Sequence, residues 1–161
     1  MQPRFLVDNN VGKLAKWLRM MGYDAMLFDD KDDGEMVKIA LSESRVILTK
    51  DTQFMKRRVI TTGKVRAVLI EDDNPKAQLP YVVSTLALDC QFRPFSLCLE
   101  CNQELVGRTK EEVRNLVPPY VFKTQNQYME CPTCHRIYWR GTHWQAMSKK
   151  LEQFMTERVN S

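Results

Sequence analysis

Four of the five cysteines in this 161-residue chain occur in two close pairs. Each pair has the spacing C-x-x-C, Cys98 with Cys101 and Cys131 with Cys134, and 29 residues separate the two pairs. A tight turn at each pair directs two thiolates toward one ion, and four thiolates complete the tetrahedral coordination of structural Zn²⁺. A single redox pair would not need the second motif, and a catalytic zinc would need an open position. We therefore predict a structural zinc site with four cysteine ligands, with His135 as the alternative ligand.

Acidic residues directly follow several apolar runs in the first half of the chain. Carboxylates gathered at one place need a hard cation as counter-ion, and Mg²⁺ and Mn²⁺ take oxygen ligands. Such an ion activates water and stabilises the charge that develops on a phosphodiester. The predicted catalytic residues are Asp8, Asp33 and Asp51, with Asp30, Glu35 and Lys13 as possible assisting residues. The alternative is that these carboxylates are ordinary helix caps and solvated turns.

Aromatic and basic residues alternate after the second cysteine pair, in the stretch Ile137-Tyr-Trp-Arg-Gly-Thr-His-Trp144. Aromatic rings stack on unpaired bases, and Arg and Lys contact phosphates, so this stretch suggests binding of single-stranded RNA. The alternative for Tyr138 and Trp139 is that they complete the small core of a zinc domain. The predicted RNA-binding residues are Lys16, Arg19, Arg136, Arg140, His143 and Lys149.

The elements that must position these groups alternate in the first half of the chain. Short, almost uninterrupted apolar runs at 4–7, 25–28, 45–48 and 67–70 predict strands of a parallel sheet covered on both faces. Helical spacing predicts helices over 12–21, 34–42, 53–60 and 78–89, with Asp33 capping the second and Gly22 ending the first. Because ligand sites of open α/β sheets form at the carboxyl ends of the strands, the acidic residues are expected to meet there.

The second half of the chain has a different composition. It holds four of the five cysteines, both histidines and an excess of basic residues, which predicts an α/β domain over 1–92 and a zinc-ribbon domain with a C-terminal helix over 93–161. Within it, 109–117 is expected to be a short helix stopped by Pro118-Pro119, and 144–159 a packed terminal helix.

Composition excludes several other classes of protein. The chain is 43% hydrophobic, too apolar for a disordered tail, yet no apolar run approaches the roughly 20 residues of a membrane span. No signal peptide, G-x-G-x-x-G or G-x-x-x-x-G-K-[ST] motif is present, which argues against secretion, dinucleotide binding and P-loop chemistry. The formal charge of +4 is only mildly basic. We expect an intracellular protein, cytoplasmic and without a membrane partner.

The combination of motifs resembles one family. The matching stretches are Arg4-Phe-Leu-Val-Asp8, Gly12-Lys-Leu-Ala-Lys-Trp-Leu-Arg19, Gly22-Tyr-Asp24, Ile47-Leu-Thr-Lys-Asp51, both cysteine pairs, Val117-Pro-Pro-Tyr-Val121 and Tyr138-Trp-Arg-Gly-Thr-His-Trp144. Together they resemble the PIN-like ribonuclease domain with fused zinc ribbon at the C-terminus of Nibbler/Mut-7-type exoribonucleases. The resemblance implies a PIN-like α/β sheet whose residues Asp8, Asp33 and Asp51 bind Mg²⁺ or Mn²⁺ and cut RNA.

Two functions follow as hypotheses. The first is a metal-dependent ribonuclease acting on single-stranded RNA, with the zinc ribbon aiding RNA binding. The second is a non-catalytic RNA-binding or protein-docking module of a larger 3′–5′ exoribonuclease, because the resemblance implies other domains or proteins of a small-RNA processing complex as partners.

Overall fold

The first half of the chain folds into an open parallel sheet. The computed structural model describes residues 2–160. Its first four strands are β1 (Arg4–Asp8), β2 (Ala25–Phe28), β3 (Arg45–Thr49) and β4 (Ala67–Leu69), all parallel and in the order β2-β1-β3-β4. The predicted α/β class and all four strand positions are confirmed, and the two central strands, β1 and β3, are buried on both faces of the sheet.

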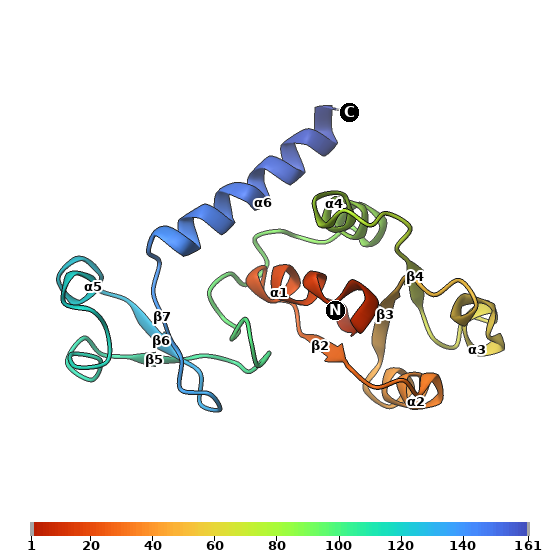
Figure 1. Cartoon of the computed structure of the whole chain (residues 1–161), viewed down its shortest axis with the longest axis horizontal. Coiled ribbons are helices and arrows are strands. Elements are labelled where there is room, and N and C mark those ends of the chain that lie inside the picture. The colour runs from red at the N-terminus through yellow and green to blue at the C-terminus, as the bar shows by residue number, and fades with distance from the viewer. Residues whose placement is uncertain (1, 161) are drawn as a thin grey trace.

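Helices cover both faces of this sheet (Figure 1). One face, with Phe5 and Val7, packs against α1 (Lys13–Met20) and α4 (Pro75–Leu86). The other face, with Leu6 and Ile47, packs against α2 (Asp33–Glu43), the 3-10 helix η2 (Phe54–Lys56) and α3 (Arg58–Thr61). The chain therefore leaves β1 and β3 toward opposite faces, because the short 3-10 helix η1 (Asn9–Val11) leads into α1 whereas η2 follows β3.

Three of the predicted helices differ in detail from the structure. The N-cap of α2 is Asp32, not Asp33: the Asp32 carboxylate accepts hydrogen bonds from the backbone N–H groups of Gly34 and Glu35. The single helix expected over 53–60 is divided into η2 and α3, because Arg57 between them adopts an extended backbone with φ −60° and ψ 140°. The helix expected over 78–89 begins earlier, at Pro75, where Asn74 caps it and proline suits the first turn.

Gly22 lies where the first half of the chain contacts the second. It has φ +95°, the left-handed conformation that glycine adopts at helix ends, and it follows α1 as expected. A Cβ at this position would collide with the backbone carbonyl of Arg93. The backbone N–H of Arg93 also donates to the carbonyl of Met21 at 2.9 Å. Glycine is therefore required here both for its backbone angle and for this close approach.

The second half of the chain contains a small antiparallel sheet. It contains β5 (Val106–Arg108), β6 (Tyr128–Glu130) and β7 (Ile137–Tyr138) in that order. The prediction of a helix over 109–117 is wrong, because residues 110–116 form turns. The helix α5 (Pro119–Thr124) lies after them, because Pro118 is extended and Pro119 starts the helix instead of stopping one.

The terminal helix α6 (Thr142–Asn160) returns to the α/β half of the chain, where it lies beside α1 and α4 (Figure 1). Its residues Leu151 and Phe154 are buried in the core that contains α1 and α4, and the Phe154 ring meets Trp17 edge-on at 5.5 Å. The helix thus follows the small sheet in sequence but packs on the α/β core. No helix in the described part of the chain is long and apolar enough to span a bilayer.

Candidate functional site

The two cysteine pairs form two turns of the same design. In each, the residue after the second cysteine has a positive φ, 62° at Asn102 and 63° at His135. The backbone N–H of that residue donates to the carbonyl of the first cysteine, at 3.0 Å from Asn102 to Cys98 and at 2.9 Å from His135 to Cys131. Each turn therefore directs both of its thiols to one side, which is the geometry of a zinc knuckle.

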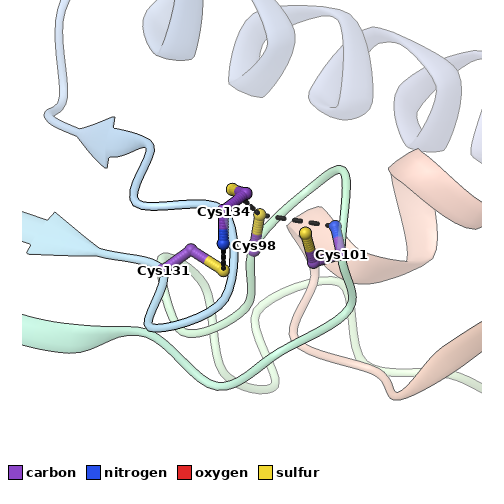
Figure 2. Close-up of side chains that lie close together, drawn as sticks. All are labelled: Cys98, Cys101, Cys131 and Cys134. Atoms are coloured by element: carbon purple, nitrogen blue, oxygen red, sulfur yellow. Dashed lines mark hydrogen bonds between the residues drawn. The ribbon is translucent and has the colours of Figure 1, made fainter.

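The four cysteine side chains converge on one point (Figure 2). Their Sγ atoms all lie within 4.8 Å of one another, and those of Cys98 and Cys134 are 3.7 Å apart. Four sulfurs placed tetrahedrally at Zn–S distances of about 2.3 Å would be about 3.8 Å apart, so the group fits Zn²⁺ closely. His135 is not part of this cluster, and its Nδ1 lies 3.5 Å from Glu130 Oε2.

The electrostatics of the cysteine group favour a bound cation. Hydrogen bonding to Cys134, together with burial and the other sulfurs, raises the pKa of Cys101 to about 12. Burial also raises the pKa of Cys131, but N–H groups of Cys134 and Thr133 donate to its sulfur and bring that pKa down to about 7. One thiolate is thus stabilised by the protein, whereas several together repel one another, and a bound Zn²⁺ removes that repulsion.

The first zinc knuckle is fastened to the parallel sheet by two polar side chains. Arg19 on α1 is buried, and its guanidinium donates to the carbonyls of Ala25 at 2.9 Å and Leu99 at 2.8 Å. Asn102 accepts from the backbone N–H of Ala25 at 3.0 Å and donates to the Asp24 carboxylate at 2.7 Å. The position of the knuckle relative to the sheet is therefore fixed by hydrogen bonds as well as by apolar contact.

The strand order reverses between β1 and β3. The chain continues from β1 to β2 on one side and later reaches β3 on the other, which makes this the topological switch point of the sheet. Asp8 ends β1, and its Oδ2 accepts a 2.7 Å hydrogen bond from the hydroxyl of buried Thr49 at the end of β3. The same hydroxyl accepts from the backbone N–H of Asp51 at 3.1 Å. Thr49 thus links Asp8 and Asp51.

The Asp51 carboxylate is held in a defined orientation. Its Oδ1 accepts hydrogen bonds from the backbone N–H groups of Gln53 at 2.9 Å and Phe54 at 3.0 Å, which leaves Oδ2 outside the capping interaction. Nearby, Lys50 forms an ion pair with Asp73 after β4, and its backbone N–H donates to Asn10 after β1. The loops after three strands therefore meet at this edge.

The remaining acidic candidates lie apart from this pair. Asp33 is half-exposed with its carboxylate 3.9 Å from the Arg57 guanidinium. Asp30 is exposed and accepts from the N–H groups of its own loop, and Glu35 is exposed in the first turn of α2. In the described residues, the four cysteines are the one group of three or more His, Cys, Asp or Glu side chains close enough to share a metal.

Three surface depressions meet around Lys16. The first, here named the α1 groove, has a volume of about 600 Å³ and runs from Asn9 and Asn10 past Lys13 to Glu100. The second, the aromatic pocket of about 440 Å³, lies between Lys16 and the small sheet. The third, the α6 groove of about 330 Å³, lies between α1 and α6. Because Lys16 lines all three, they form one connected surface.

The predicted RNA contacts fall into three groups, of which one lines this surface. Lys16, Arg136 and His143 line the aromatic pocket together, although Lys16 also pairs with Glu100 at 3.2 Å. Arg140 is exposed, with its guanidinium 5.0 Å above the Phe95 ring, and Lys149 is exposed on α6 outside the three depressions. Arg19 differs from all of these, because it is buried and its hydrogen bonds go to backbone carbonyls.

Three residues with a role at these sites escaped sequence reasoning. Thr49 was part of a recognised motif, but only the strand register places its hydroxyl against Asp8. Asn102 follows a cysteine pair, and its contacts to the sheet are long-range. Tyr120, 69% exposed, lines the aromatic pocket, and its place in the Pro-Pro-Tyr motif is the sequence signal for it.

These features define a class of protein: a parallel α/β domain with carboxylates at its switch point, joined to a small four-cysteine sheet of the zinc-ribbon kind. A family model described as the Mut7-C RNAse domain matches residues 3–151. The chain belongs to the Mut7-C RNase domain family, which implies a nuclease with an RNA substrate. Comparison with curated proteins and with solved structures found no significant match.

Proposed function

We propose that this chain is a metal-dependent ribonuclease that hydrolyses phosphodiester bonds of single-stranded RNA at the carboxyl edge of β1 and β3. The observation that carries the proposal is the linkage of Asp8 and Asp51 through Thr49 at the switch point, in a chain that belongs to an RNase family. Sites of open α/β sheets form at such switch points.

The residues at this edge suit Mg²⁺ or Mn²⁺. Mg²⁺ is commonly held by one or two carboxylates, with water and substrate phosphates completing the shell. Asp8 and Asp51 would hold it, and Asp33 would join them if its carboxylate turned away from Arg57. When bound, the ion lowers the pKa of a water molecule and offsets charge on the scissile phosphate. Thr49 orients the Asp8 carboxylate, and the backbone N–H groups after Asp51 orient the second carboxylate.

The proposed RNA path leads from this edge into the α1 groove. The groove starts at Asn9 and Asn10, directly after Asp8, and continues to Lys13 and Lys16 at the beginning of α1. Across the three connected depressions there are four exposed Lys or Arg side chains and two acidic ones; the basic residues are Lys13, Lys16, Arg136 and Lys150. The excess of positive charge supports contact with a phosphate backbone. The zinc ribbon would aid binding because its first knuckle and its aromatic pocket border the same path.

The second candidate is a non-catalytic RNA-binding or docking module of a larger 3′–5′ exoribonuclease. One observation favours it: Asp33 does not join Asp8 and Asp51, whereas the basic depressions would bind RNA without any catalytic cation.

RNA cleavage and RNA binding, measured side by side, separate the two candidates. The wild-type chain, Asp8→Asn and Asp51→Asn are incubated with labelled single-stranded RNA and Mn²⁺, with Glu152→Gln on the exposed face of α6 as the matched control. The nuclease proposal expects cleavage by the wild type and by Glu152→Gln, and loss of cleavage in both aspartate variants with RNA binding retained. If all four proteins bind RNA and none cleaves it, the binding module is the correct function.

A further inference from the structure

An exposed tyrosine borders the aromatic pocket on the zinc-ribbon side. Tyr120 is the second residue of α5, directly after Pro119, and its side chain is 69% exposed. The next residue, Val121, is buried with Tyr128 in the core of the small sheet. Val121 therefore anchors the helix, while Tyr120 stays at the surface. Its aromatic ring does not contribute to the core and is available to a ligand.

A second aromatic side chain forms a fixed wall of the same pocket. Trp139 packs partly against the core of the small sheet, and it lines the pocket. Its indole lies close to Gly141: a Cβ there would be 2.7 Å from Nε1 and 2.9 Å from Cδ1. Glycine at this position thus lets the indole lie against the backbone. Tyr138, in contrast, is committed to the zinc knuckle, because its hydroxyl contacts Cys98 Sγ and the backbone N–H of Leu99.

Positive charge lies on the same pocket. Arg136, Lys16 and His143 all line it, and Arg136 is exposed. The one acidic side chain in the lining, Glu100, is paired with Lys16, and that hydrogen bond, with the nearby Arg136 and Arg19, holds the pKa of Glu100 below its usual range. The pocket therefore combines aromatic faces with cationic side chains, the combination that binds a stacked base together with its phosphate.

We propose that the aromatic pocket is a subsite for one unpaired nucleotide of the RNA, with the base stacked on Tyr120 beside Trp139 and the phosphate held by Arg136 and Lys16. This inference rests on the proposed function and extends it, because it assigns a specific contact to the zinc ribbon. The pocket shares Lys16, Leu99 and Glu100 with the α1 groove, so a strand held here continues toward Asp8 without leaving the connected surface.

The test measures the affinity for a fluorescein-labelled single-stranded oligo(U) 12-mer by anisotropy, without added divalent cations. Loss of a stacked base corresponds to about a 5- to 150-fold weaker affinity, which is expected for Tyr120→Ala. Tyr120→Phe keeps the ring and is expected to bind like the wild type. The matched control is Tyr81→Ala, which removes a tyrosine that is 49% exposed on α4, in the α/β half of the molecule and away from α5 (Figure 1).

Glu100→Gln provides a variant with a gain in affinity. Removing the carboxylate frees Lys16 for phosphate, so the affinity is expected to rise about 2- to 5-fold, a change that misfolding cannot produce. A duplex 12-mer is expected to bind more weakly than the single strand, because its bases are not available for stacking. Equal binding of duplex and single strand, or weaker binding by Glu100→Gln, contradicts the subsite.

The outcomes separate this inference from the proposed function. If the wild type binds and cleaves oligo(U) but Tyr120→Ala binds as tightly as Tyr81→Ala, the subsite is refuted and the nuclease proposal stands. If the wild type neither binds nor cleaves oligo(U), the proposed function fails and the subsite fails with it. Zinc content and circular dichroism of Tyr120→Ala confirm that the altered protein is folded.

Discussion

Replacement of Arg19 by methionine tests how the zinc ribbon is joined to the α/β core. Arg19 is 8% exposed, and its guanidinium donates to the carbonyls of Ala25 at 2.9 Å and Leu99 at 2.8 Å, with a longer contact of 3.4 Å to the carbonyl of Glu100. Methionine has a similar length and fills the site, but it leaves both buried carbonyls without this donor. Hydrogen bonds from charged groups contribute about 1.5–3 kcal/mol each. Burial lowers the pKa of Arg19, which means that desolvation of the guanidinium offsets part of the stabilisation from these hydrogen bonds. We therefore use about 1.5 kcal/mol for each bond.

Two bonds at the lower value give a loss of about 3 kcal/mol in the free energy of unfolding for Arg19→Met. For a chain of this size, that loss lowers the melting temperature by about 6–12 °C. Urea unfolding followed by circular dichroism measures the change. Lys16→Met, on the same helix but half-exposed, is the matched control and is expected to lose less than about 1 kcal/mol.

The alternative role of Arg19 is a phosphate contact. In that case Arg19→Met would keep its stability within about 0.5 kcal/mol of the wild type, as surface substitutions do, and would lose RNA affinity. That pair of results would refute the structural role of this arginine and support the phosphate contact predicted from the sequence.

Three further predictions concern the acidic edge, the zinc site and the sheet. Thr49→Val removes the hydroxyl that orients Asp8, so RNA cleavage or metal affinity is expected to fall about 10- to 100-fold, with Thr49→Ser retaining activity; equal activity of both variants contradicts the role of the hydroxyl. Removal of zinc by a chelator is expected to unfold 96–145 while the parallel sheet persists, as hydrogen exchange would show; unchanged protection of that segment argues against a structural metal. Burial raises the pKa of Asp24, but hydrogen bonds from Arg45 and Asn102 outweigh it and hold that pKa below 3.8. Its contribution to stability is therefore present above pH 3.8 and is lost as the pH falls through the lower folded value, so Asp24→Asn should flatten the acid limb of the stability curve; an unaltered limb contradicts this.

Local sequence patterns predicted the elements whose environment is uniform. The strands around Leu6 and Ile47 are apolar on both faces, so no partner outside the run was needed to identify them. The zinc site was equally local, because each C-x-x-C turn is formed within a few residues. The carboxyl-edge position of Asp8 and Asp51 followed from the parallel order of the strands.

The features that were missed depend on contacts between distant parts of the chain. Arg19 is close to Asp8 in sequence, which suggested a phosphate contact, but its acceptors include Leu99, 80 residues away. The segment 110–116 has good helix formers, yet it folds as turns around the buried Val113. Tyr120 is exposed because its neighbour Val121 anchors α5, and that arrangement becomes visible only when the small sheet is assembled.

The most direct test of the central claim is the binding of Mn²⁺ at Asp8 and Asp51, measured by electron paramagnetic resonance on the zinc-loaded chain without RNA. The claim predicts that the wild type binds Mn²⁺, that Asp8→Asn and Asp51→Asn lose this binding, and that Glu152→Gln keeps it. Equal binding of Mn²⁺ by the wild type and Asp8→Asn would contradict it.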